Sequence, residues 1–161
     1  MLFNELDKIE HYCVNGKKLN EKIIQKLINL SQDYSISELV DNCLAKNKKK
    51  IINIFNENNF DYSDCIIIIR TLLTKSKRLL TLAKEYKNNK NIDLTIASAK
   101  PPIFWKDKEI TKQQLLGWKA ENIQKLIYKI IEIELSIKKN LNNSLNITSD
   151  FVIHQSSRSN N

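Results

Sequence analysis

Glycine and proline are nearly absent from this chain of 161 residues, which contains only two of each. Folds rich in tight β-turns need more of both, because turns with positive φ favour glycine and proline presets the first corner of a turn. A phosphate-binding nucleotide loop also needs glycines, since several consecutive backbone amides must wrap the phosphates. The sequence therefore argues against a β-rich fold and against a nucleotide-hydrolysing phosphate loop.

Cysteine and histidine are also sparse. The three cysteines, Cys13, Cys43 and Cys65, are widely spaced and form no zinc-ligand pattern. Each falls on the apolar face of an expected helix, so we expect buried free thiols, as suits a reducing cytoplasm. His11 and His154 lie in different segments. No set of side chains predicts a catalytic, metal or cofactor site, and no cofactor is expected.

Positive charge is in excess. The chain has 26 Lys and Arg against 18 Asp and Glu, giving a formal net charge of +8. Such a surface can serve a polyanionic partner. However, 23 of the 26 basic residues are Lys, and Asn and Ile are also abundant, as AT-rich codons would produce. A functional basic surface and a solvated, composition-driven one both stay open. The longest apolar run, 65–69, is far too short to span a membrane.

Amphipathic helical patterns recur along the chain, and alternating strand patterns hardly appear. The sequence therefore predicts an all-α helical bundle. We expect the longest helix to begin at a cap, Asp61 or Ser63, and to reach about Tyr86. Its run 66–69 is apolar on every side, so this helix should cross the middle of the bundle. Asp61 and Asp64 are interpreted as capping residues, since a helix N-terminus favours negative charge.

The domain organisation follows from the polar breaks. Residues 31–34 read as a connector between two domains. The first, 1–33, is expected to hold two short helices, and the second, 34–155, is a larger helical domain. A capping-box spacing at Ser35 and Glu38 predicts that the larger domain begins with a helix. Residues 156–161 read as a disordered tail. Further helices are expected over about 92–98, 109–116, 119–140 and 145–155.

The segment 99–140 contains the most distinctive local sequence. Pro101 and Pro102 fix two φ angles and predict a stiff, extended turn before Phe104. Four aromatic residues, Tyr86, Trp105, Trp118 and Tyr128, are interpreted as packing or subunit-contact anchors; the alternative is that they stack on nucleic-acid bases.

One polar residue interrupts the apolar stripe of the helix expected over 119–140. An unpaired carboxylate at Glu134 would be costly there. Arg70 lies at the end of the apolar run of the longest helix, in a chain where Lys is the usual base. We therefore hypothesise an Arg70–Glu134 pair that joins the two helices, because the planar guanidinium can bind a carboxylate with two nitrogens. The alternative is a local pair between Glu134 and Lys138.

Several of these features occur together in one known family. Five stretches, in the same order, resemble the delta subunit of bacterial DNA polymerase III, a clamp-loader component: Asn4–Ile9, Ser37–Asp41, Ile68–Leu73 with Arg78–Leu80, Pro101–Phe104, and Glu134–Lys138.

The resemblance implies an architecture. Residues 1–33 would be the C-terminal part of an AAA+ lid, and 34–155 a helical collar domain that packs in a ring with gamma/tau-type and delta-prime-type subunits. By the same resemblance, the residues that pack the family motifs are Pro101, Pro102, Phe104, Trp118 and Lys138.

The resemblance also implies a function. The chain would be a non-catalytic subunit of the complex that loads the sliding clamp in DNA replication, with any DNA contact indirect or weak. In the family, the clamp is opened by an N-terminal AAA+-like module, which would precede residue 1. We therefore expect a fragment, or a module supplied separately. The alternative function is that of a small basic all-α protein that binds nucleic acid directly.

Overall fold

The computed structural model describes residues 10, 13–14 and 30–157. The chain divides into two compact units, Met1–Ser35 and Ile36–Asn161. The two helices expected within 1–33 lie almost entirely outside the described residues. The fold described below is that of the second unit.

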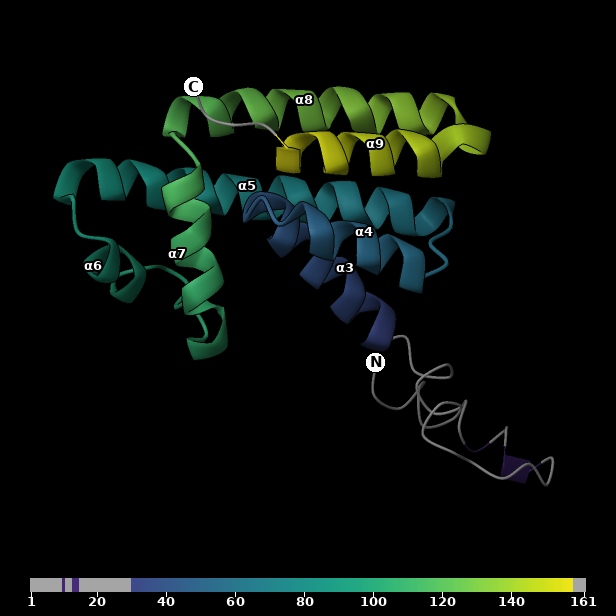
Figure 1. Cartoon of the computed structure of the whole chain (residues 1–161), viewed down its shortest axis with the longest axis horizontal. Helices are drawn as coiled ribbons and strands as arrows, with labels where there is room; N and C mark the ends of the chain where they lie inside the picture. The colour runs from purple at the N-terminus through teal and green to yellow at the C-terminus, as the bar shows by residue number, and fades with distance from the viewer. Residues whose placement is uncertain (1–9, 11–12, 15–29, 158–161) are drawn as a thin grey trace. The chain divides into compact units, whose positions relative to one another are not determined.

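The described part of the chain is all helical, with turns between the helices and no strand. This confirms the predicted all-α fold (Figure 1). None of its helices is long and apolar enough to cross a membrane. In chain order the elements are α3 (Leu30–Leu44), α4 (Lys48–Glu57), α5 (Tyr62–Asn89), α6 (Ile92–Ala97), the 3-10 turn η1 (Trp105–Asp107), α7 (Lys108–Gly117), α8 (Ala120–Lys139), the 3-10 turn η2 (Leu141–Asn143) and α9 (Ser144–Ser157).

The longest helix, α5, begins at the predicted cap. The backbone N–H of Asp64 donates to Asp61 Oδ1 over 2.9 Å, and the backbone N–H of Asp61 donates to Asp64 Oδ2 over 2.8 Å. This reciprocal capping box satisfies two backbone donors that the helix itself leaves unpaired. The helix continues three residues beyond the predicted end, because nothing in 87–89 prevents helical backbone until Lys90 takes a left-handed conformation with φ of 53°.

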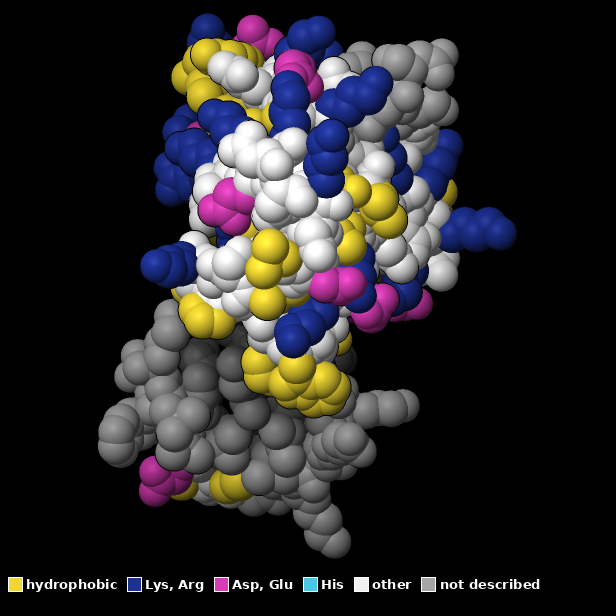
Figure 2. Space-filling view, turned by 90° about the vertical axis from the view of Figure 1, so that its left-hand side faces the viewer, with side chains coloured by type: hydrophobic (Ala, Val, Ile, Leu, Met, Phe, Trp, Pro, Cys, Tyr) yellow, Lys and Arg dark blue, Asp and Glu magenta, His cyan; other side chains and the backbone are white. Residues whose placement is uncertain are grey.

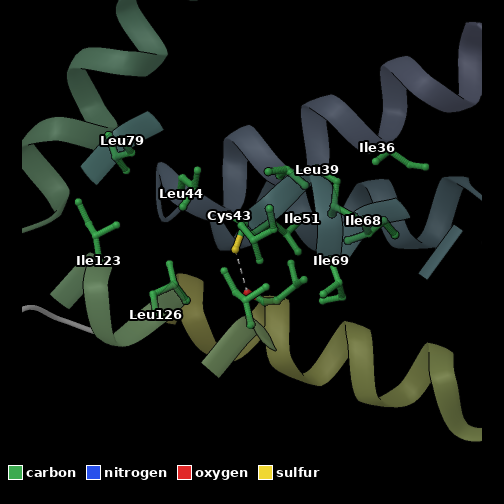
Figure 3. Close-up of a cluster of buried hydrophobic side chains, with 14 of the residues drawn as sticks. Ile36, Leu39, Cys43, Leu44, Ile51, Ile68, Ile69, Leu79, Ile123 and Leu126 are labelled. Carbon is green, nitrogen blue, oxygen red and sulfur yellow. Dashed lines mark hydrogen bonds between the residues drawn. The ribbon is translucent and has the colours of Figure 1, made fainter. Parts of the chain in front are cut away.

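The core lies where α5 packs against α8, and α6, α7 and α9 also contact α5. Ile68, Ile69 and Leu72 of α5 are fully buried, as are Ile123 and Ile130 of α8. Figure 3 shows how such side chains from several helices point into one cluster. The apolar run 66–69 is not buried on every side, because Ile67 is 43% exposed. The helix is central, but one side of it faces solvent.

Buried cysteines contribute to this core. Cys43 is fully buried, and its Sγ donates to the carbonyl of Val152 over 3.6 Å (dashed line in Figure 3). Burial raises the pKa of the Cys43 thiol to about 12, so this sulfur stays protonated and unreactive. Cys65 is buried too, and burial also raises its pKa.

Three further sequence-based expectations were wrong. The expected connector 31–34 is helical, because it contains no glycine or proline to end a helix, and α3 therefore begins before Ser35. Ser156 and Ser157 belong to α9 rather than to a tail, and Ser156 is buried. Cys13 is exposed. Its apolar spacing predicted one face of a helix, but such spacing does not show whether another element covers a predicted face.

Ser76 of α5 is fully buried, and its Oγ has no hydrogen-bond partner among the described residues. A buried hydroxyl without a partner costs about 1–3 kcal/mol, and serine is also a weaker helix former than alanine. We expect Ser76→Ala to raise the free energy of unfolding by about 1 kcal/mol, measured by urea denaturation.

The matched control is Thr148→Val in α9. Thr148 is equally buried, but its Oγ1 donates to the carbonyl of Ser144 over 2.8 Å. Losing that bond should lower stability by about 1 kcal/mol. If Ser76→Ala destabilises the protein as much as Thr148→Val does, the Ser76 hydroxyl has a stabilising role that the packing does not reveal.

Candidate protein-interaction site

The structure brings Arg70 and Glu134 together. Arg70 Nε lies 3.1 Å from Glu134 Oε1, which joins α5 to α8 across 64 residues of sequence. The contact is made through Nε to one oxygen, rather than by two nitrogens to two oxygens. The Arg70 side chain is 62% exposed and that of Glu134 only 16%, so the carboxylate is set into the apolar stripe while the guanidinium reaches it from the surface.

The alternative partner of Glu134 is present at the same time. Lys138 Nζ contacts the same oxygen, Glu134 Oε1, over 2.7 Å. The pKa of Glu134 is lowered chiefly by this hydrogen bond from Lys138, with a smaller contribution from Arg70, against the opposing effect of burial. Two cations therefore compensate one largely buried carboxylate, and the hypothesised long-range pair and the local pair coexist.

The turn at Pro101 and Pro102 is held by an arginine that sequence reasoning did not single out for this role. Arg78 Nη2 donates to the carbonyl of Pro101 over 2.6 Å and lies 3.4 Å from the carbonyl of Pro102. The Lys100–Pro101 peptide bond is cis. Proline carbonyls have no helix or sheet partner here, so a charged donor from α5 satisfies them. In the sequence, Arg78 had been noted only as part of the stretch of the longest helix that resembles the family.

The aromatic residues differ in exposure. Trp118 is buried, and its Nε1 donates to the carbonyl of Leu44 over 2.7 Å. Phe104 and Trp105, by contrast, are 58% and 67% exposed, with ring centroids 5.8 Å apart. Lys106 Nζ lies 5.3 Å from the centroid of the Trp105 ring. Trp118 is thus a packing anchor, whereas Phe104 and Trp105 form an exposed aromatic pair beside the proline turn.

A polar cluster that the sequence did not predict ties α3 to α5 and α7. Lys75 Nζ contacts Asp41 Oδ2 over 2.7 Å and Ser37 Oγ over 2.8 Å. Gln114, which is buried, donates to the carbonyl of Asp41 over 3.1 Å. Ser37 and Asp41 lie one turn apart on α3, in a stretch that carried part of the family resemblance. The i, i+4 spacing of Ser37 and Asp41 could have indicated that they share one face of a helix, but nothing in the sequence identified Lys75 as their partner.

Helix α8 presents apolar side chains away from the core. Tyr128, Ile131 and Leu135 are 63%, 43% and 54% exposed, at the i, i+3, i+7 spacing of one helical face. The opposite side of the same helix is buried against α5 through Ile123, Ile130 and others. We call Tyr128, Ile131 and Leu135 the outer stripe of α8. Apolar side chains exposed together on one helical face can serve as a protein-binding surface.

Charge is unevenly placed. Figure 2 shows the end of the bundle that carries α6, α7 and the first turns of α8. Lys and Arg side chains gather over its upper part, with apolar groups between and below them. Within the described part of the chain, no group of three or more His, Cys, Asp and Glu side chains could hold a metal ion. The part of this end that the structure describes thus presents mainly basic and apolar side chains.

Comparison with known proteins shows a similarity to a replication protein. The chain is 31% identical over 122 residues to the DNA polymerase III subunit delta of Buchnera aphidicola subsp. Schizaphis graminum (strain Sg). The match covers 76% of this chain and 35% of that protein, so the chain spans about a third of the length of its relative. No family model matches the chain, and no solved structure matches it. The similarity is to the same family that the sequence motifs resemble.

The pairing of Glu134 predicts a pH-dependent stability. Because its pKa is lowered in the folded protein, its contribution is complete above the ordinary carboxyl value of 4.5 and is lost as the pH falls below that value. We expect Glu134→Gln to lower the free energy of unfolding by about 1 kcal/mol at neutral pH. The difference from the native protein should shrink on acidification, as measured by urea denaturation along a pH series.

Glu132→Gln is the matched control, since Glu132 is an exposed carboxylate on the same helix. It should change stability little at any pH. A Glu134→Gln loss that stays constant from neutral to acidic pH would show that the two ion pairs contribute nothing and that the effect is one of packing.

Proposed function

We propose that this chain acts in DNA replication as the collar part of a delta-type subunit of DNA polymerase III. The observation that carries the proposal is the similarity to a DNA polymerase III subunit delta across 76% of the chain. In this proposal residues 34–155 form the helical collar, and residues up to 33 correspond to the end of an AAA+ lid. The chain contributes contacts between proteins and no catalytic group.

The outer stripe of α8 is the surface proposed to meet a neighbouring subunit. Its three apolar side chains sit on a helix of 20 residues whose other face is fixed against α5. A partner would therefore meet a preformed surface, and little conformational entropy would be lost on binding. Burying large side chains of this kind is the main favourable term in most protein–protein association.

The proposed partners are the other clamp-loader subunits, of gamma/tau and delta-prime type. No sliding-clamp contact is assigned to any residue of this chain. The direct nucleic-acid binder is the competing function, and the two differ in salt dependence. Binding to phosphates weakens steeply as salt rises because it depends on counterion release, whereas a packed apolar interface persists.

The test is reconstitution. The full chain is mixed with the gamma/tau-type and delta-prime-type subunits of the same organism and analysed by size-exclusion chromatography with light scattering, at moderate and at high salt. We expect a complex that contains one copy of this chain and survives high salt.

The α8 surface is tested in the same assay. The Tyr128→Glu, Leu135→Glu double variant should weaken the complex by at least about tenfold, while Lys49→Glu, at an exposed position on α4, should not. Absence of any complex with the native chain would contradict the proposed function. A complex that forms normally with the double variant would instead show that another face makes the contact.

A further inference from the structure

A groove of about 600 Å³ lies at the end of the bundle that Figure 2 turns toward the viewer. It is formed where the last turns of α5, the end of α7 and the start of α8 meet, and we call it the α5–α7–α8 groove. Its apolar lining comes from Ala83, Tyr86, Leu115, Leu116, Trp118 and Ala120. It is separate from the outer stripe of α8, which contributes no residue to it.

The groove is held in shape by buried contacts. Trp118, which lines it, is only 7% exposed and is fixed by its hydrogen bond to the carbonyl of Leu44. Lys46 Nζ lies over the Trp118 ring at 4.8 Å from its centroid. Leu115 belongs to the core at 3% exposure. A ligand would thus enter a preformed site rather than one that has to open.

One side chain at the groove is exposed to an unusual degree. Leu116 is 72% exposed, more than any other large apolar side chain that the structure describes in the second unit. It follows Leu115, which is buried, and precedes Gly117, which has no side chain. Leaving so much of a leucine in water at the edge of an apolar groove favours a partner that covers it.

The surroundings of the groove are basic. Lys87 and Lys119 line it together with one acid, Glu121. Lys87 Nζ contacts Glu121 Oε1 over 3.0 Å, but both side chains are more than 60% exposed, and such surface pairs contribute little. The flanking stretches 84–90 and 119–125 together contain five Lys and two Glu. An apolar groove with this rim complements a ligand that is itself both apolar and acidic.

We propose that the α5–α7–α8 groove binds an acidic peptide segment of a partner protein, which inserts one large apolar side chain against Leu116 and Trp118 and places its carboxylates near Lys87 and Lys119. The lining favours a peptide over a nucleic acid, because bases need an exposed aromatic face for stacking, whereas the Trp118 ring is buried and has Lys46 over it. The proposal does not depend on assembly with other subunits, since every residue that it uses belongs to this chain.

The test uses the full chain and fluorescently labelled probes, with binding followed by anisotropy. The first probe is a short peptide in which Asp and Glu flank a single Phe; the second replaces that Phe by Ala; the third is a single-stranded oligonucleotide carrying the same dye. We expect the Phe peptide to bind at least about tenfold more tightly than the Ala peptide, and the oligonucleotide not to displace it.

Two protein variants locate the site. Leu116→Glu should weaken binding of the Phe peptide by at least about tenfold, since it places a like charge in the groove. Leu94→Glu is the matched control, because Leu94 is an exposed leucine of α6, at 54%, that does not line the groove. Both positions are exposed, and circular dichroism of each variant checks that the fold is retained.

Three results would each overturn the proposal that the groove binds an acidic peptide. Equal affinity for the Phe and Ala peptides would mean that only charge attracts the probe. Displacement of the peptide by the oligonucleotide would assign the basic end to nucleic acid. Equal affinities of the Leu116→Glu and Leu94→Glu variants would place any binding elsewhere. Because no other subunit is present, none of these results bears on the proposed assembly.

Discussion

Burial of α5 against α8 is the constraint on which the second unit depends. The two helices share the largest set of contacts between any pair of described elements, and their facing residues are fully buried isoleucines and leucines. Burial of such side chains is the dominant favourable term in folding. An ion pair lies near each end of this contact. Arg70, near the start of α5, meets Glu134, near the end of α8, and Lys87, near the end of α5, meets Glu121, at the start of α8. The two helices therefore run antiparallel.

Polar contacts position the remaining helices on this pair. Asp41 of α3 meets Lys75 of α5 and Gln114 of α7, so one carboxylate and its own carbonyl connect three helices. Trp118 reaches the end of α3 through the carbonyl of Leu44. Directional bonds of this kind specify which faces meet, whereas apolar contacts alone would allow several packings. Apolar side chains such as Leu116 and Tyr128 are left exposed on this frame.

Much of the fold could be predicted from the sequence, because helical periodicity and caps are local signals. Asp61 and Asp64 identified the start of α5, and the rarity of arginine drew attention to Arg70, whose side chain lies within 3.1 Å of Glu134. Contacts between distant segments were harder to foresee. Nothing in the sequence indicated that Lys75 pairs with Asp41 or that Arg78 reaches the Pro101 carbonyl, since helical periodicity does not show which distant acceptor a basic side chain will meet. The α5–α7–α8 groove was equally hidden, because it exists only once three helix ends meet.

Native-state hydrogen exchange of the full chain tests most directly whether α5 is the element on which the bundle depends. We expect the amides of 68–72 to exchange only through global unfolding, with a free energy equal to that from denaturant titration and above that of the short helix α6. Exchange of 68–72 at a lower free energy than global unfolding, or as fast as α6, would contradict it, because the bundle would then keep its structure while its central helix opened.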